Sequence, residues 1–170
     1  MVSEKKTALV AVVMGSNSDM AVMQSCIEQL GDFGIETVVR IISAHRTPQI
    51  ASQFAQTAAQ NKIKVIIAAA GMAAHLAGAL AAQTQLPVIG VPIAAKDGLA
   101  GIDALLSTVQ MPPGVPVATV GIGKAGAKNA AILAAQILAL SNKTLAGKLV
   151  EFKKDQEKTV IEKDSALRQD

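Results

Sequence analysis

The chain has 170 residues, enough for one compact domain with a sizeable core, and its formal net charge is only +3. Hydrophobic residues make up 51% of the sequence but aromatic residues only 2%, so the core must be aliphatic. The modest charge and the scarcity of aromatic side chains exclude nucleic acid as an expected partner. A single cysteine, Cys26, cannot form an internal disulfide, and residues 1–7 lack an apolar secretion signal. These features predict a cytoplasmic protein.

Strand-like and helix-like segments alternate along the chain. The first run, Ala8 to Met14, is continuously apolar, as in a strand covered on both faces. Further strands are predicted at Ile35–Ile42, Lys64–Ala69, Pro87–Pro92 and Val115–Ile122, and helices at about 20–30, 48–60, 73–83, 102–108 and 125–140. This alternation predicts a three-layer α/β domain whose five-stranded parallel sheet has the flavodoxin-like order 2-1-3-4-5.

The predicted core covers about residues 8–140, and a charged C-terminal helix is expected from Asn142 to about Ala166. Leu145, Leu149, Val150 and Phe152 give that helix an apolar stripe that can dock on the body or on a neighbouring subunit. We expect residues 1–170 to form a single domain. The high apolar content of so short a chain also predicts a homo-oligomer, in which subunit contacts bury part of the surface.

The most apolar stretch runs from Val65 to Ala82, with His75 as its only strongly polar residue. Its length alone would suffice for a membrane span. At Gly71, however, its character changes from β-branched residues to alanine, which predicts a strand, a glycine turn and a helix. We therefore expect no membrane-spanning segment.

Polar loops follow the predicted strands at their carboxyl ends, where open α/β sheets bind ligands. The loop Gly15–Asp19 precedes a helix whose first N–H groups lack partners, so it suits an anion such as phosphate. An equally good interpretation is that Ser18 or Asp19 simply caps the helix. The segment Ser43–Pro48 places His45 and Arg46 side by side before the next helix, and chemistry is expected there. The alternative for His45 is a plain helix-entry residue.

Other motifs are weaker. His75, at the end of the glycine turn Gly71–His75, fits a packed or hydrogen-bonded structural residue better than a catalyst. The segment Gly121–Gly126 matches G-x-G-x-x-G but follows the last strand and lacks an acidic residue about 20 positions on, so no dinucleotide is inferred. Cys26 is expected in the core. Two histidines and no clustered cysteines predict no metal site.

Four stretches taken together are highly specific: Met14–Asp19, Ser43–Pro48, Ala70–Leu76 and Val109–Val117. In sequence, order and spacing they closely resemble the signatures of the N5-carboxyaminoimidazole ribonucleotide mutases, the class I PurE family of purine biosynthesis. The resemblance extends from about Ala8 to Leu140. The third stretch departs from the usual Gly-Gly-Ala-Ala-His-Leu-Pro-Gly, because Met72 replaces the second glycine and Ala77 the proline. Because of these two departures, the resemblance does not determine the backbone path of that loop.

The resemblance implies a flavodoxin-like homo-octamer that acts on a small ribonucleotide. It implies that Ser16, Asp19 and Arg46 bind the ribonucleotide, that His45 shuttles a proton, and that Ser18, Ser43 and the loop Gly71–His75 line the pocket. The implied reaction moves a carboxylate from the exocyclic nitrogen of aminoimidazole ribonucleotide to ring carbon C4. No cofactor is expected, because an upstream ATP-dependent enzyme would supply the carbamate.

Two other interpretations remain. The sister enzyme of the same family, a carboxylase that uses CO2 directly, resembles Ser-Ala-His-Lys where this chain has Ser-Ala-His45-Arg46, which favours the mutase. The other alternative is a non-catalytic flavodoxin-like nucleotide-binding or receiver module. The absence of Trp and Tyr argues against flavin, and Ala68–Ala70 stand where a phospho-receiver has an aspartate at the end of the third strand.

Overall fold

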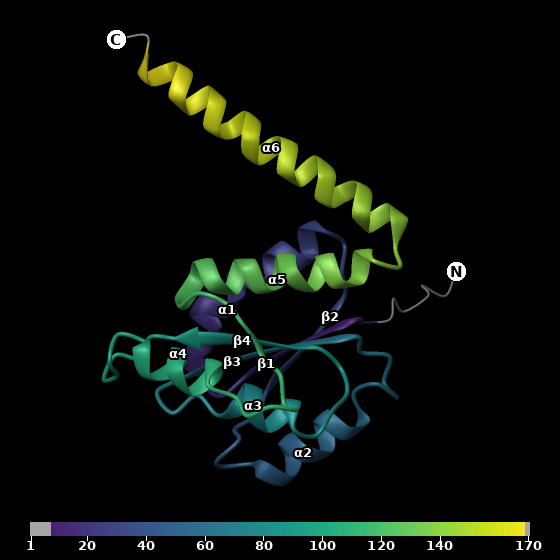
Figure 1. Cartoon of the computed structure of the whole chain (residues 1–170), viewed down its shortest axis with the longest axis vertical. Helices are drawn as coiled ribbons and strands as arrows, with labels where there is room; N and C mark the ends of the chain where they lie inside the picture. The colour runs from purple at the N-terminus through teal and green to yellow at the C-terminus, as the bar shows by residue number, and fades with distance from the viewer. Residues whose placement is uncertain (1–7, 169–170) are drawn as a thin grey trace.

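The structure of the chain is a computed structural model that describes residues 8–168. Five parallel strands form one twisted sheet in the order β2-β1-β3-β4-β5 (Figure 1). The strands are β1 (Val10–Met14), β2 (Thr37–Ile41), β3 (Val65–Gly71), β4 (Val88–Ile93) and β5 (Ala118–Thr119). The predicted α/β class and flavodoxin-like strand order are therefore confirmed.

Helices cover both faces of the sheet. They are the 3-10 turn η1 (Asn17–Asp19) and α1 (Met20–Asp32), α2 (Pro48–Thr57), α3 (Leu76–Ala81), α4 (Ile102–Val109), α5 (Gly123–Ala139) and α6 (Lys143–Leu167). Alternate β1 residues face opposite sides: Val10 and Val12 join the core under α1 and α5, whereas Ala11 and Val13 join the core over α2 and α3. Figure 1 shows these helix pairs as separate layers above and below the sheet.

Strand β2 is partly exposed. Its β-branched residues are typical of a buried strand, but Val39 is 37% exposed and Ile41 54% exposed. The strand order explains the difference, because β2 lies at an edge of the sheet and pairs only with β1. The adjoining Ile42, in contrast, is buried in the α2–α3 core.

Two other elements are shorter than predicted. Strand β5 is limited to two residues, since Pro116 within the expected strand has no N–H to donate to a sheet. Helix α3 begins at Leu76 and not near Ala73, because the turn after β3 occupies residues 72–75. The apolar stretch 65–82 thus divides into strand, turn and short helix as expected. Within residues 8–168, no helix is long and apolar enough to cross a membrane.

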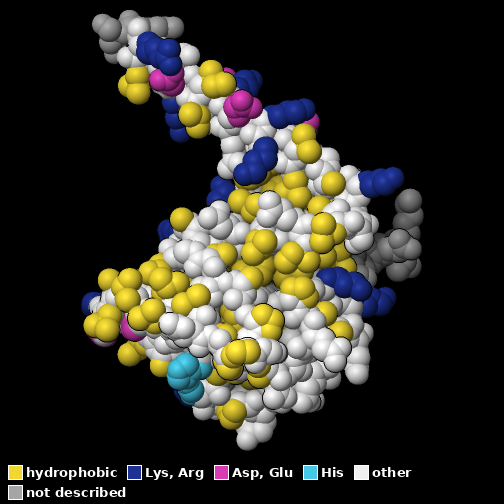
Figure 2. Space-filling model, in the orientation of Figure 1, with side chains coloured by type: hydrophobic (Ala, Val, Ile, Leu, Met, Phe, Trp, Pro, Cys, Tyr) yellow, Lys and Arg dark blue, Asp and Glu magenta, His cyan; other side chains and the backbone are white. Residues whose placement is uncertain are grey.

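The first turns of α6 dock on the body. Leu145 is buried, and Leu149 and Phe152 pack against the core under α1 and α5. The Phe152 and Phe33 rings meet edge to face with centroids 5.3 Å apart, and Lys148 Nζ donates to the Phe33 carbonyl at 2.8 Å. Val150, predicted in the same stripe, is 54% exposed. Beyond this contact, α6 projects away from the body (Figures 1 and 2).

Candidate active site

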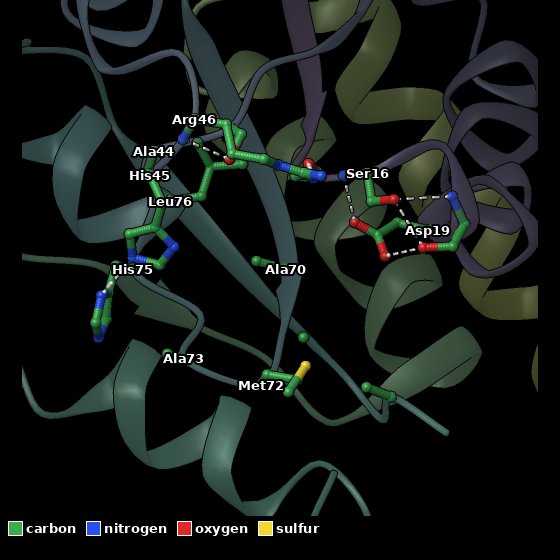
Figure 3. Close-up of a pocket in the computed structure, with 15 residues that line it drawn as sticks. Ser16, Asp19, Ala44, His45, Arg46, Ala70, Met72, Ala73, His75 and Leu76 are labelled. Carbon is green, nitrogen blue, oxygen red and sulfur yellow. Dashed lines mark hydrogen bonds between the residues drawn. The ribbon is translucent and has the colours of Figure 1, made fainter. Parts of the chain in front are cut away.

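A cavity of about 520 Å³ lies at the carboxyl ends of β1, β2 and β3. Because β1 lies between β2 and β3, the loops that follow these three strands become neighbours. Every residue predicted for the site lines this cavity: Ser16, Ser18, Asp19, Ser43, His45, Arg46, Gly71 and His75. The structure thus assembles one site from three segments far apart in sequence (Figure 3).

The first loop is held by a capping box. Ser16 Oγ accepts a hydrogen bond from the Ser18 N–H at 3.3 Å, and Asp19 Oδ2 accepts one from the Ser16 N–H at 3.0 Å. Ser16 is therefore the N-cap of η1, whereas Asp19 occupies the N-cap position of α1 without a side-chain capping bond there, because its carboxylate is used in the box. Asp19 is only 6% exposed, and this burial raises its pKa, opposed by hydrogen bonds from Ser16, Ser18 and Gly15. These hydrogen bonds fix the loop at the start of the helix.

The second loop carries His45 and Arg46 on a hydrogen-bonded turn. Ser43 N–H donates to Thr47 Oγ1 at 3.0 Å, and Arg46 N–H donates to Ser43 Oγ at 3.1 Å. The Arg46 side chain crosses toward the first loop, where its Nη2 donates to the Gly15 carbonyl at 3.3 Å (Figure 3). A guanidinium charge therefore lies beside the capping box, where it can meet an anionic ligand group.

The third loop brings a second imidazole to the first. His45 Nε2 and His75 Nδ1 are 2.9 Å apart, and the rings meet nearly at right angles, with an interplanar angle of 84°. His75 is hydrogen-bonded, as one interpretation predicted, but it is exposed and not packed. His45 is more than a helix-entry residue, because its ring contacts His75 and lines the cavity.

The two departures in the third loop leave the site intact. Met72 adopts the left-handed conformation, with φ of 56°, which a glycine would adopt without strain. Its side chain is 54% exposed and lines the cavity. Ala77, which stands where the family usually has proline, is buried in the first turn of α3. The loop therefore reaches the cavity despite both changes.

Sequence reasoning missed one lining segment. Ala95 follows β4 and closes the cavity beside Gly71, where a Cβ atom would lie 3.0 Å from the Ile93 carbonyl oxygen. Alanine carries no chemical signal, and only its position directly after a strand could have indicated its place. The glycine segment Gly121–Gly126 runs into the first turn of α5 and serves close backbone packing, because a Cβ on Gly126 would overlap the Gly121 carbonyl.

Two further expectations concern cysteine and metal. Cys26 is fully buried in the core, and burial raises the pKa of its thiol to about 12. Among residues 8–168, no three His, Cys, Asp or Glu side chains are grouped so that they could hold a metal ion.

The fold and the cavity define a flavodoxin-like α/β protein with a ligand pocket at the strand-order switch between β1 and β3. Residues 9–159 match the family described as AIR carboxylase, and the chain belongs to this family.

Relatives of known name agree over nearly the whole chain. An N5-carboxyaminoimidazole ribonucleotide mutase of Saccharolobus solfataricus is 54% identical over 89% of this chain and 94% of its own. The Escherichia coli K12 protein of the same name is 50% identical over 95% of both chains. The crystal structure of Treponema denticola PurE superimposes with a TM-score of 0.83 at 34% identity, covering 94% of this chain and 98% of that one.

Proposed function

We propose that this protein converts N5-carboxyaminoimidazole ribonucleotide to 4-carboxy-5-aminoimidazole ribonucleotide in de novo purine biosynthesis. It is an isomerase, because the carboxylate moves within one molecule. The observation that carries the proposal is the convergence of the capping-box loop, Arg46 and His45 in one cavity. Close relatives that bear this enzyme's name support the same conclusion.

The cavity offers complementary groups for a ribonucleotide. The Ser16 and Ser18 hydroxyls and the Arg46 guanidinium suit the phosphate, since charged and hydroxyl donors bind phosphate oxygens well. The Asp19 carboxylate can accept from sugar hydroxyls. Ser43, Gly71 and His75 complete the wall around the aminoimidazole ring. None of these groups calls for a cofactor.

We assign the proton transfers to His45. When the carbamate nitrogen takes a proton from His45, the N–C bond breaks, its electron pair stays on nitrogen, and CO2 is released into the cavity. Ring carbon C4 then attacks CO2, and His45 recovers a proton from C4 as the ring regains aromaticity. An imidazole suits both steps because its ordinary pKa lies near 6.5. Retention of CO2 beside C4 makes its recapture effectively intramolecular.

The variant His45→Asn tests this assignment. Asparagine keeps a hydrogen-bonding group but cannot titrate, so nucleotide binding should persist while kcat falls about a hundredfold or more. Calorimetric titration and a steady-state assay measure the two quantities separately. A kcat within about tenfold of the parent would show that another group moves the proton.

A second candidate is direct carboxylation of aminoimidazole ribonucleotide by CO2, favoured by the name of the matched family. The two reactions differ in the source of the carboxylate. Unlabelled carbamate substrate is supplied in buffer rich in ¹³C-bicarbonate, without ATP or metal, and the product is analysed early in turnover. The mutase should place almost no label in the product, after correction for spontaneous decarboxylation. Dominant label would favour the carboxylase, and no product would favour a non-catalytic nucleotide-binding module.

We further propose that the protein works in the cytoplasm as a homo-octamer, downstream of an ATP-dependent carboxylating enzyme. The octamer is supported by apolar side chains that one subunit leaves exposed on β2, α4 and the distal part of α6. Figure 2 shows hydrophobic side chains gathered over α4 on the visible face. The upstream partner follows from the substrate, since a carbamate of this kind must be made by an energy-dependent carboxylation.

A further inference from the structure

The imidazole rings of His45 and His75 link the loops that follow β2 and β3. Their contact joins residues 30 positions apart through a short nitrogen–nitrogen distance of 2.9 Å. Both backbones are fixed locally: Arg46 N–H donates to Ser43 Oγ, and Ala79 N–H donates to the His75 carbonyl at the start of α3. The ring contact therefore joins two segments whose backbones are each held by a local hydrogen bond.

Nε2 of His45 is used in this contact, whereas Nδ1, on the other edge of the ring, has no hydrogen-bond partner among residues 8–168. In Figure 3 the free edge, which carries Nδ1, faces the side of Ala70, another residue that lines the cavity. A substrate in the cavity therefore meets Nδ1, whereas Nε2 belongs to the contact with His75. The proton that His45 moves in the proposed reaction must be carried on Nδ1.

The number of protons in the contact limits how it can operate. Two ring nitrogens that form one hydrogen bond share a single proton, so one donates and the other accepts. If His45 keeps its proton on Nε2 and donates it to His75 Nδ1, then Nδ1 of neutral His45 has a free lone pair toward the cavity. If His75 donates instead, neutral His45 holds its proton on Nδ1 and cannot accept another there.

From this geometry we infer that His75 is a positioning residue for His45, a role that rests on the proposed function. Neutral His75 accepts from Nε2–H of His45 and so selects the tautomer with Nδ1 free for proton transfer. The same hydrogen bond persists when His45 becomes imidazolium, because Nε2 then still carries its proton. His75 thereby resembles the third member of a catalytic triad, although it brings no charge.

Imidazole ¹⁵N NMR tests the tautomer directly, independently of turnover. The chain contains only two histidines, so the spectrum holds two rings, and the His75→Leu variant assigns them. In alkaline buffer the parent should show His45 with a protonated Nε2 and an unprotonated Nδ1. The His75→Leu variant should show His45 as a mixture of tautomers. The inference is wrong if parent His45 is protonated on Nδ1, or if its tautomer is the same in both proteins.

A double-mutant cycle tests whether His75 acts through His45. His75→Leu should lower kcat at least about tenfold with little change in KM, since the lost alignment affects proton transfer and not binding. His75→Asn keeps a polar acceptor near the Nδ1 position and should recover most of the rate. In the His45→Asn background, His75→Leu should cause no further loss, because the group that it positions is already absent.

The outcomes separate the inference from the function on which it rests. Losses that multiply in the double variant, or an Asn variant as slow as the Leu variant, would show that His75 acts independently of His45. Because His75 is exposed, both variants should fold, and circular dichroism checks this. A parent without turnover would refute the proposed reaction, yet the NMR experiment would still decide whether His75 sets the tautomer of His45.

Discussion

At the scale of single residues, the loop Gly15–Asp19 combines two properties that the sequence offered as alternatives. Ser16 and Asp19 form the capping box and also line the cavity. The motif indicated a polar helix start, but a cap and an anion site require the same residue types, so only the hydrogen bonds could identify Ser16 as the N-cap of η1. Substitutions here should affect both stability and binding, and not binding alone.

Asp19 allows the two effects to be separated. Asp19→Leu removes the acceptor of the Ser16 N–H and should lower the free energy of unfolding by about 0.5–2 kcal/mol while weakening nucleotide binding. Asp19→Asn keeps an acceptor oxygen, so the free energy of unfolding should not fall, whereas affinity for the nucleotide should. Thermal melts beside calorimetric titration measure both quantities. Equal stability of the Leu and Asn variants would contradict a stabilising capping box.

The difference in stability between the parent and Asp19→Asn should also depend on pH. Burial raises the pKa of Asp19 in the folded state, so its proton is held more tightly there than in the unfolded chain. The stabilisation of the fold by protonated Asp19 is therefore fully present below the ordinary pKa near 3.8. It is lost as the pH rises through the higher pKa of Asp19 in the folded state. As the pH rises over this range, the free energy of unfolding of Asp19→Asn should increase relative to that of the parent.

Met72 makes a further prediction at this scale. Its left-handed φ of 56° is unfavourable for a residue with a Cβ atom by about 1–2 kcal/mol. Met72→Gly should raise the free energy of unfolding by up to about 1 kcal/mol, because glycine loses part of that gain through greater freedom in the unfolded chain. Met72→Ala is the matched control, since it removes the same long side chain but keeps the Cβ atom. A similar gain in both variants would point to the side chain and not the backbone.

At the scale of elements, the sequence predicted the existence and order of strands better than their exposure. Continuous apolar runs identified β1 and β3, which are covered on both faces. The β-branched residues of β2 look the same in one dimension, and its edge position depends on where the chain returns in the sheet. The order β2-β1-β3, which the alternation of strands and helices predicted, brings the loops of His45 and His75 together, but the contact between the two rings was not predicted.

Helix α6 provides the prediction for an element. Its attachment rests on Leu145, Leu149 and Phe152, and the Phe152 ring packs against Phe33. Phe152→Ala should lower the free energy of unfolding by about 1–3 kcal/mol, below the full value for a buried phenylalanine because Phe152 is only partly buried. Lys153→Ala, at the exposed neighbouring position, should stay within about 0.5 kcal/mol of the parent. Equal effects would mean that α6 does not depend on this contact.

At the scale of the whole molecule, the exposed apolar side chains predict assembly. Ile41 on β2, Leu106 on α4 and Ile161 on α6 are each more than half exposed, on elements well apart in the fold. Burial of apolar surface at several separate places favours an assembly larger than a dimer. Multi-angle light scattering at micromolar concentration should give a mass several times that of one chain, and eight times if the octamer is correct. A monomer would contradict the prediction.

The depth at which Cys26 lies has a practical consequence for these measurements. The chain has no tryptophan and no tyrosine, so its intrinsic fluorescence is a poor reporter of unfolding. Its single thiol lies in α1 with no exposed surface, between the helix layer and the sheet. A thiol reagent can modify Cys26 only while that layer is open, so the labelling rate counts openings of the core. Cys26 is therefore a built-in probe of core opening, at a position outside the cavity.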